Sequence, residues 1–385
     1  MGTWSLAHAT ALKDAGVEVA VVSLTPSIPS FASKLAPRVA FYSNCPEQWS
    51  ANGIQVNFPR WYCYPITQFW GTMGKAPEQL LSLGWRSARR SVFRLVDSIR
   101  PDMILANHSL VNGYVAGRIK QETKVPFVTV DHESGDFEMC ISNQKWKKVL
   151  DFVTDQSALG ITVSKSMQKI AEKANPQGTY QTIYNGADFS VSKPSLGRHV
   201  EKDELTIFCC ANFYERKDIP LLIRAFAKLK AMFPNVSLRI AGDGPDKDRI
   251  LACIGEVDCT ESVILLGLIS QHRVQEEMNR ADIFALVGWG EPFGVVFLEA
   301  LANGCPVVLS EDAGAAEILK DGETALFTKP RNEQSVLAAL TRLCHSADER
   351  RRIAESGHSY FDQRCTWRSR AQEYLEVFEH VIGLS

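Results

Sequence analysis

The segment that most constrains the fold runs from Ile283 to Ala302 and holds a strand, a turn and a helix in close succession. Residues 283–287 are a continuous apolar run, which is typical of a strand buried on both faces of a parallel sheet. Pro292 and Gly294 mark a turn, and the residues after them have helical composition. We therefore expect a parallel α/β sheet with a ligand site at the carboxyl end of this strand.

Two carboxylates flank the start of this helix. Glu291 follows the strand, and Glu299 lies about one and a half turns into the helix, on the face that looks back toward the same crevice. The free N–H groups of Phe293, Gly294 and Val295 favour an anion such as phosphate, and carboxylates accept hydroxyl protons. The pattern predicts a polyhydroxylated ligand that carries a diphosphate. An N-capping glutamate with one solvated helix glutamate is the alternative interpretation.

Length and composition favour an ordinary globular protein with two domains. The chain has 385 residues and 45% hydrophobic content. No apolar stretch approaches the ~20 residues that span a bilayer, and no signal peptide opens the chain. The ten cysteines form no C-x-x-C pair. We therefore expect reduced cysteines in a cytoplasmic protein, without a structural zinc site.

The charge is distributed unevenly along the chain. Residues 1–183 carry 19 lysines and arginines against 14 acidic residues, but no basic run is dense enough to predict nucleic-acid binding. The predicted helix Pro77–Ile99 carries four arginines, Arg86, Arg89, Arg90 and Arg94. One hypothesis is that these arginines allow peripheral contact with an anionic membrane face. A solvated helix face is the favoured alternative.

Both halves of the sequence have the β-α-β rhythm of a parallel sheet. In the first half a helix at Ser5–Ala15 precedes a strand at Val17–Leu24, and a later strand is expected at Val125–Val130. A doubly wound domain normally opens with a buried strand and a Gly-rich turn, yet Met1-Gly2 stands where that turn is expected. The first N-terminal strand is therefore predicted to be missing.

The pattern changes after Tyr184, where a polar segment with Pro194 and Gly197 suggests a linker. A second β-α-β series follows, with strands expected at Leu205–Cys210, Ser237–Ala241, Val263–Leu266, Ile283–Val287 and Val307–Leu309. The predicted domains are residues 1–190, residues 191–365 and a C-terminal helix at 366–385 that packs back on the first domain.

Four motifs in this order resemble the retaining family 4 glycosyltransferases of the GT-B fold. They are G-E-P-F-G-V-V-F-L-E-A-L-A-N-G-C-P-V-V, A-G-D-G-P, I-Y-N-G-A-D and E-R-K-D-I-P-L-L-I-R-A-F. The resemblance implies an α/β protein with two Rossmann-like domains facing each other across a cleft. It also implies that Glu291 contacts the donor sugar, that Glu299 binds the ribose hydroxyls, and that the Phe293–Gly294–Val295 backbone faces the sugar and diphosphate.

Lys217 is the predicted cation for the donor diphosphate. A fixed ammonium favours the transition state because negative charge develops on the leaving group. Five residues earlier, at a position where the family commonly has an arginine, this chain has Asn212. Asn212 could hydrogen-bond a phosphate oxygen without supplying charge, and the neighbouring Arg216 is a candidate substitute.

The resemblance also assigns roles to a histidine and two glycines. His132 follows the strand Val125–Val130 and resembles the family's histidine near the donor sugar, although Glu133 stands where the family usually has glycine. Gly2 resembles the glycine whose N–H approaches the diphosphate. Gly242 shapes the A-G-D-G-P turn beside the nucleotide. That turn is not G-x-G-x-x-G, which argues against a dinucleotide site.

The predicted function is retaining transfer of a sugar from a UDP-sugar or GDP-sugar to a glycan or lipid-linked acceptor in polysaccharide or glycoconjugate synthesis. Family resemblance implies that the departing phosphate takes the acceptor proton, so no general base is assigned. No cofactor or metal is expected, because no D-x-D follows a strand. The alternatives are a GT-B sugar-nucleotide 2-epimerase and a catalytically decayed binding protein.

Overall fold

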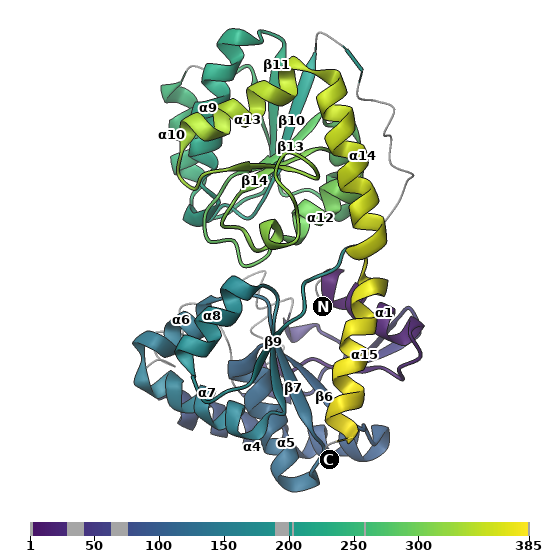
Figure 1. The fold of residues 1–385 in the computed structure, drawn as a ribbon. Coiled ribbons are helices and arrows are strands. Elements are labelled where there is room, and N and C mark those ends of the chain that lie inside the picture. Colours follow the sequence, from purple (N-terminus) through teal and green to yellow (C-terminus); the bar gives the residue numbers. More distant parts are fainter. Residues whose placement is uncertain are drawn as a thin grey trace. The chain divides into compact units, whose positions relative to one another are not determined.

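The structure is a computed structural model that describes residues 3–28, 42–62, 76–188, 200–201, 204–257 and 259–383. The chain divides into two compact units, one of Met1–Tyr184 with Ala371–Ser385 and the other of Asn185–Arg370. The limits predicted from the sequence are 190/191 and 365/366. Figure 1 labels the helices and strands of both units.

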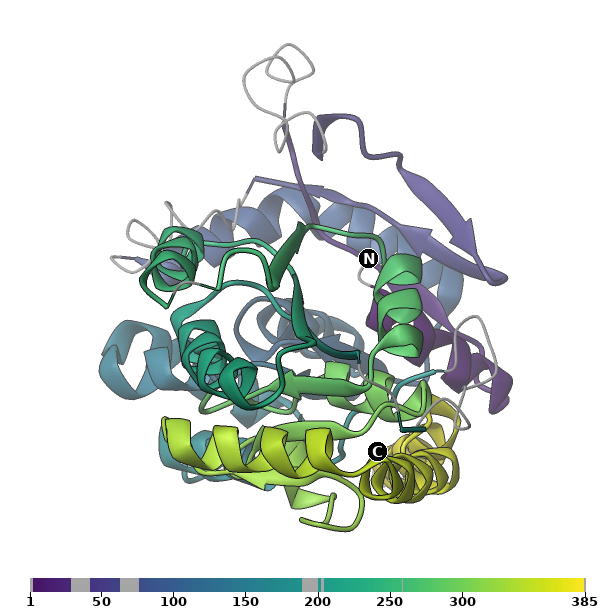
Figure 2. The same cartoon turned by 90° about the horizontal axis from the view of Figure 1, so that it is seen from above.

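The second unit is built on one parallel sheet. Among the described residues, its order is β12–β11–β10–β13–β14–β15, and every neighbouring pair is parallel. Its strands are β10 (Leu205–Cys210), β11 (Val236–Ala241), β12 (Val263–Gly267), β13 (Ile283–Leu286), β14 (Val307–Ser310) and β15 (Leu326–Thr328). All four residues of β13 and all four of β14 are buried, because helices cover both faces of the sheet (Figures 1 and 2).

The connections of this unit are helical, as the β-α-β rhythm predicted. They are η4 (Glu215–Lys217), α9 (Ile219–Met232), α10 (Lys247–Glu256), α11 (Gln271–Arg280), α12 (Val295–Ala302), η5 (Gly314–Glu317), α13 (Glu333–His345) and α14 (Ala347–Arg364). Helix α9 packs against α10 and α13, while α12 packs against α14. The sheet order reverses between β10 and β13, so their carboxyl ends flank the position where doubly wound sheets bind ligands.

The first unit contains several smaller sheets. In the part of the chain that the structure describes, β6–β7–β8–β9 is parallel, β1 pairs with β4 in parallel and β4 with β3 antiparallel, and β2 pairs with β5. The strands are β1 (Ala20–Val22), β2 (Thr25–Pro26), β3 (Gln48–Ala51), β4 (Ile54–Asn57), β5 (Arg60–Trp61), β6 (Ile104–Asn107), β7 (Phe127–Asp131), β8 (Leu159–Thr162) and β9 (Tyr180–Thr182). The strand expected at Val17–Leu24 is shorter in the structure, where β1 covers only Ala20–Val22. Val17 and Val19 precede it and pack against the hydrophobic core.

Helices cover the β6–β9 sheet. They are α1 (Thr3–Asp14), α4 (Pro77–Ile99), the π-helical turn η2 (Ser109–Gly113), α5 (Tyr114–Thr123), α6 (Gly135–Ser142), α7 (Gln144–Gln156), α8 (Lys165–Ala174) and α15 (Trp367–Gly383). Helix α4 has the predicted bounds, with Pro77 in its first turn and Arg100 in the left-handed conformation at its end. The last helix, α15, joins the core of this unit through Tyr374, Val377 and Phe378.

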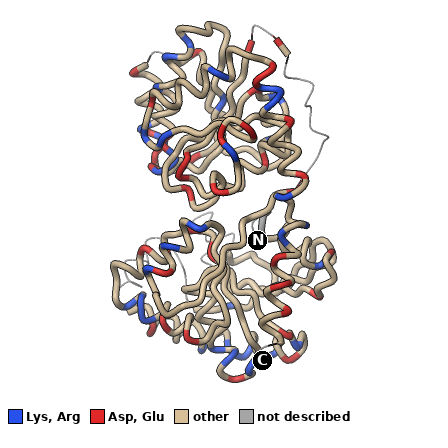
Figure 3. The backbone as a smooth tube through the Cα atoms, in the orientation of Figure 1, with Lys and Arg blue, Asp and Glu red and all other residues tan. Residues whose placement is uncertain are grey.

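Charged residues and cysteines occur in both units. Figure 3 shows acidic and basic residues interspersed over each unit. Every described cysteine is a free thiol, and most are buried. Within the described residues, no helix is both long and apolar enough to cross a bilayer.

Candidate functional site

A pocket of about 340 Å³ lies at the carboxyl edge of the sheet in the second unit. Ligand pockets of this size are common at such edges. Its walls come from β10, the β11 turn, α11 and the start of α12. They include seven of the residues predicted from the sequence: Asn212, Lys217, Gly242, Glu291, Gly294, Val295 and Glu299.

The ammonium of Lys217 forms an ion pair with the Glu291 carboxylate. Both side chains are mostly buried, with 12% and 13% exposed. A partly desolvated ion pair of this kind holds both side chains in one geometry, because removing either partner leaves a charge in a poorly hydrated place. The pair therefore places one cation and one carboxylate side by side in the pocket wall.

Gly288 allows the segment after β13 to lie close to η4, which carries Lys217. A Cβ atom on Gly288 would lie 2.3 Å from the Arg216 carbonyl oxygen and 2.7 Å from the Lys217 Cα. The next residue, Trp289, donates its N–H to that same Arg216 oxygen over 2.8 Å. The end of β13 is thus hydrogen-bonded to η4, and this contact positions Lys217 beside Glu291.

Gly314 lies against the other side of the loop that carries Glu291. A Cβ on Gly314 would lie 2.1 Å from the Pro292 carbonyl oxygen. Gly314 N–H donates to the Glu291 carbonyl over 2.9 Å, and Ala315 N–H donates to the Phe293 carbonyl over 3.0 Å. The loop that carries Glu291 is therefore fixed by backbone hydrogen bonds from η5, which is how a preorganised site is built.

Helix α12 begins at the pocket. Its N-cap is Gly294, which has a φ of 84° and so adopts the left-handed conformation that favours glycine. A Cβ there would also lie 2.4 Å from the Phe297 ring. Because the first N–H groups of a helix lack intrahelical partners, the start of α12 can receive an anion.

Glu299 lies on the pocket-facing side of α12. Its carboxylate accepts a hydrogen bond of 2.8 Å from the Gln271 side chain, at the start of α11. Burial raises the pKa of the Glu299 carboxyl, and the hydrogen bond from Gln271 opposes that shift. A carboxylate held this way can accept hydrogen bonds from ligand hydroxyl groups.

The A-G-D-G-P turn packs against the loop after β10. Gly242 has a φ of 143°, and a Cβ on it would lie 1.9 Å from the Ala211 carbonyl oxygen. Phe213 N–H donates to the Asp243 carbonyl over 2.9 Å. This close backbone contact places Asn212 in the pocket wall beside Gly242.

Four predicted residues are not in this pocket wall. Arg216 does not line the pocket, and Phe293 is only 1% exposed in the core. His132 belongs to the first unit, where its Nε2 lies 3.4 Å from the Asn107 Oδ1. Gly2 lies outside the described residues.

Sequence reasoning missed Gly288, Gly314 and Gln271. The two glycines act by the absence of a side chain, and only the packing of η4 and η5 shows why a Cβ would clash there. Gln271 follows Ser270, the N-cap of α11. The serine N-cap makes this helix start detectable in the sequence. Gln271 and Glu299 are 28 residues apart, however, and nothing in the sequence indicates that they pair.

Two family models match successive parts of the chain. The model described as Glycosyltransferase Family 4 matches residues 1–191, and the model described as Glycosyl transferases group 1 matches residues 197–360. Together the matches extend over nearly the whole sequence, with the transition near the boundary between the two units.

Curated relatives carry glycosyltransferase and synthase names. An uncharacterized glycosyltransferase of Methanocaldococcus jannaschii is 26% identical over 353 residues, which cover 87% of this chain and 86% of the relative. The N-acetyl-alpha-D-glucosaminyl L-malate synthase of Bacillus anthracis is 23% identical over 290 residues, covering 73% of this chain and 75% of the relative.

Solved structures show the same fold at low sequence identity. Sucrose-phosphate synthase from Thermosynechococcus elongatus has a TM-score of 0.77 at 17% identity, covering 98% of this chain and 92% of its own. HepE of Anabaena, solved with UDP and glucose, has a TM-score of 0.71 at 20% identity, covering 98% of this chain and 96% of its own. The predicted fold class, GT-B with two Rossmann-like α/β units, is confirmed.

Proposed function

This chain belongs to the group 1 and family 4 glycosyltransferases, and from that membership we propose that it is a retaining enzyme that uses a UDP-sugar or GDP-sugar. The acceptor in this proposal is a glycan or a lipid-linked sugar, and the pathway is polysaccharide or glycoconjugate synthesis. The observation that carries the proposal is the Lys217–Glu291 pair beside the start of α12, in one pocket with Glu299.

Each group in the pocket matches one part of such a donor. Lys217 and the N–H groups at the start of α12 supply positive charge for a diphosphate. Glu291 accepts hydrogen bonds from sugar hydroxyls, and Glu299 accepts them from the ribose. During transfer the bond from the anomeric carbon to the diphosphate oxygen breaks, and the diphosphate leaves with the electron pair. A bond to the acceptor oxygen forms on the same face, and the departing phosphate takes the proton of the acceptor hydroxyl.

The ion pair has a further role in the absence of donor. Since Lys217 and Glu291 satisfy each other's charge, both are already held at the wall that the diphosphate and sugar would occupy. Donor binding would then redistribute existing contacts, and less side-chain entropy would be lost than if both chains were mobile. Transition-state charge on the diphosphate would strengthen the Lys217 interaction relative to the ground state.

Product analysis tests the proposal. The protein is incubated with radiolabelled UDP-glucose, UDP-GlcNAc, UDP-galactose or GDP-mannose, with and without a panel of glycan and lipid-linked acceptors. We expect acceptor-dependent release of nucleotide and an α-linked product from an α-linked donor, which NMR of the anomeric proton detects. A β-linked product would contradict retention, and interconversion of the donor sugar without acceptor would identify an epimerase.

Lys217→Ala is the matching variant. It removes the charge that stabilises the leaving diphosphate, so kcat should fall by about 10²–10³ while the circular dichroism spectrum is unchanged. Lys320→Ala is the control, because Lys320 is exposed and pairs only with the exposed Glu323 at 3.4 Å. Normal turnover of a folded Lys217→Ala protein would remove Lys217 from the reaction.

A further inference from the structure

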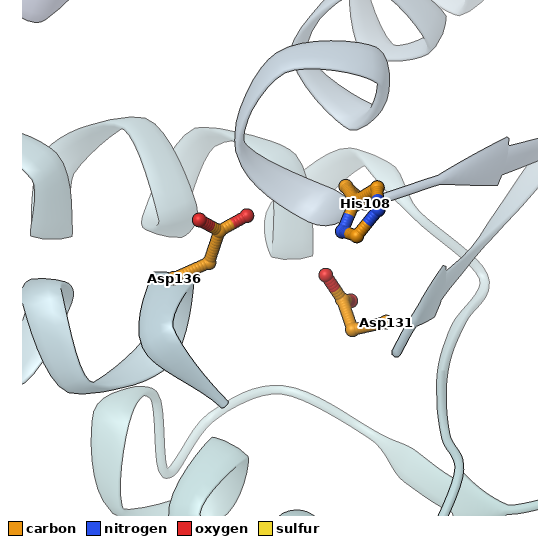
Figure 4. Close-up of side chains that lie close together, drawn as sticks. All are labelled: His108, Asp131 and Asp136. Carbon is orange, nitrogen blue, oxygen red and sulfur yellow. The ribbon is translucent and has the colours of Figure 1, made fainter. Parts of the chain in front are cut away.

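A second group of chemically reactive side chains lies in the first unit, at the carboxyl edge of its β6–β9 sheet. His108 follows β6, Asp131 is the last residue of β7, and Asp136 is in the first turn of α6. One donor atom from each of the three lies within 4.8 Å of the other two. Figure 4 shows both carboxylates directed toward the imidazole, with a shared space between the three side chains.

Among the residues that the structure describes, no lysine or arginine pairs with the carboxylates of this cluster. Asp131 is 1% exposed, and its carboxylate accepts hydrogen bonds from the Ser109 N–H over 2.8 Å and the Ser109 hydroxyl over 2.5 Å. These donors are neutral. Across the described ranges, neither Asp131 nor Asp136 forms an ion pair, although buried carboxylates are usually paired with a cation or bound to a metal.

Burial shifts the pKa of both carboxyl groups. It raises the pKa of the Asp131 carboxyl to about 6, although the hydrogen bonds from Ser109 and the nearby His108 act in the opposite direction. Burial also raises the pKa of the Asp136 carboxyl. The proposal depends on the positions of these groups: both carboxylates lie beside one imidazole, and a bound cation would balance their negative charge.

The spacing fits a metal ion. Three atoms that are at most 4.8 Å apart always have a common point no more than about 2.8 Å from each, so shifts of a few tenths of an ångström give bonds of about 2.0–2.6 Å. One imidazole nitrogen with two carboxylate oxygens is a mixed set. Imidazole favours transition metals over Mg²⁺ and Ca²⁺, while the carboxylates are compatible with Mn²⁺ and Zn²⁺.

We propose that His108, Asp131 and Asp136 bind one divalent transition-metal ion of the Mn²⁺ or Zn²⁺ kind. Three protein ligands leave coordination positions open, as in zinc sites that also bind water or a substrate. The site is at the carboxyl edge of a parallel sheet, where ligands of such sheets bind. Its three ligands belong to the first unit, whereas the residues that line the proposed donor pocket belong to the second.

Titration of the full-length protein with Mn²⁺ tests the proposal, because the electron paramagnetic resonance signal of free aqueous Mn²⁺ is lost on binding. We expect one tight Mn²⁺ per chain, displaced by Zn²⁺. Asp136→Asn should weaken Mn²⁺ binding at least tenfold, since it removes an anionic ligand. The control is Asp155→Asn, which removes an exposed carboxylate from α7 and should bind Mn²⁺ like the original protein.

A spectroscopic measurement identifies the nitrogen ligand. Electron spin echo envelope modulation of the bound Mn²⁺ should show coupling to an imidazole ¹⁴N, and His108→Asn should remove it. Asparagine is chosen because His108 has a φ of 70°, a conformation that asparagine adopts readily. The proposal is overturned by absence of stoichiometric Mn²⁺ binding, by unchanged affinity in Asp136→Asn, or by persistence of the ¹⁴N coupling in His108→Asn.

Discussion

Lys217 and Glu291 are 74 residues apart in the sequence and form one ion pair in the pocket wall. The roles of Glu291 and Glu299 can be distinguished because each would contact a different part of the donor. Glu291 is proposed to face the sugar, where positive charge develops at the anomeric carbon. Glu299, hydrogen-bonded to Gln271, is proposed to face the ribose, which is remote from the bond that breaks.

Substitutions of the two glutamates should therefore have different effects on binding and turnover. Glu299→Gln should mainly weaken nucleotide binding, by about 1.5–3 kcal/mol if a hydrogen bond to a charged group is lost. Glu291→Gln should lower kcat more than it raises KM, because its effect is greatest in the transition state. Calorimetric titration with UDP and GDP, followed by turnover at saturating donor, measures both effects. The opposite pattern would exchange the two assignments.

At the scale of elements, the pocket depends on how closely β13 approaches η4. The contact is made by the backbone, with Gly288 against Arg216 and Lys217 and with the Trp289 N–H on the Arg216 carbonyl. Such a contact leaves no room for a methyl group. The geometry of the Lys217–Glu291 pair is thus set by a glycine that makes no contact with substrate in the proposal.

Gly288→Ala tests this dependence. The added Cβ would lie 2.3 Å from the Arg216 carbonyl oxygen, so η4 must shift, at a cost of about 1–3 kcal/mol in unfolding free energy. Displacement of Lys217 by about 1 Å should lower kcat up to about 10²-fold. Gly255→Ala in α10 is the control, because its Cβ would meet nothing within 4 Å. Equal activity of Gly288→Ala and Gly255→Ala would show that η4 tolerates the displacement.

At the scale of the whole molecule, the two ends of the sequence share one hydrophobic core. Leu12 of α1 and Tyr374 of α15 belong to the same cluster as Val128 and Ile161 of the sheet. The His8 ring lies against the Tyr374 ring, with centroids 4.4 Å apart. Burial lowers the pKa of His8 to about 4, since the core disfavours its charged form.

This burial predicts a specific loss of stability in acid. Between about pH 6.5 and pH 4 the unfolded chain protonates His8 while the folded chain does not, so the contribution of His8 to stability falls as the pH is lowered. From pH 7 to pH 5 the loss should be about 2 kcal/mol. Urea unfolding at both pH values measures it, with His8→Gln as the non-titrating comparison. An identical pH dependence in the two proteins would contradict the assignment.

The sequence by itself determined five of the six described strands of the second unit, the strand–turn–helix with Glu291 and Glu299, and the α/β class, because these depend on apolar runs, turn residues and local order. The short strand β15 was not predicted. Only the tertiary structure decided that Lys217 pairs with Glu291, that Gln271 reaches Glu299, and that His108, Asp131 and Asp136 meet. It also removed Arg216 from the pocket wall. Local patterns specify which residues stand at the end of a strand, whereas the order of strands in the sheet determines which of those ends become neighbours.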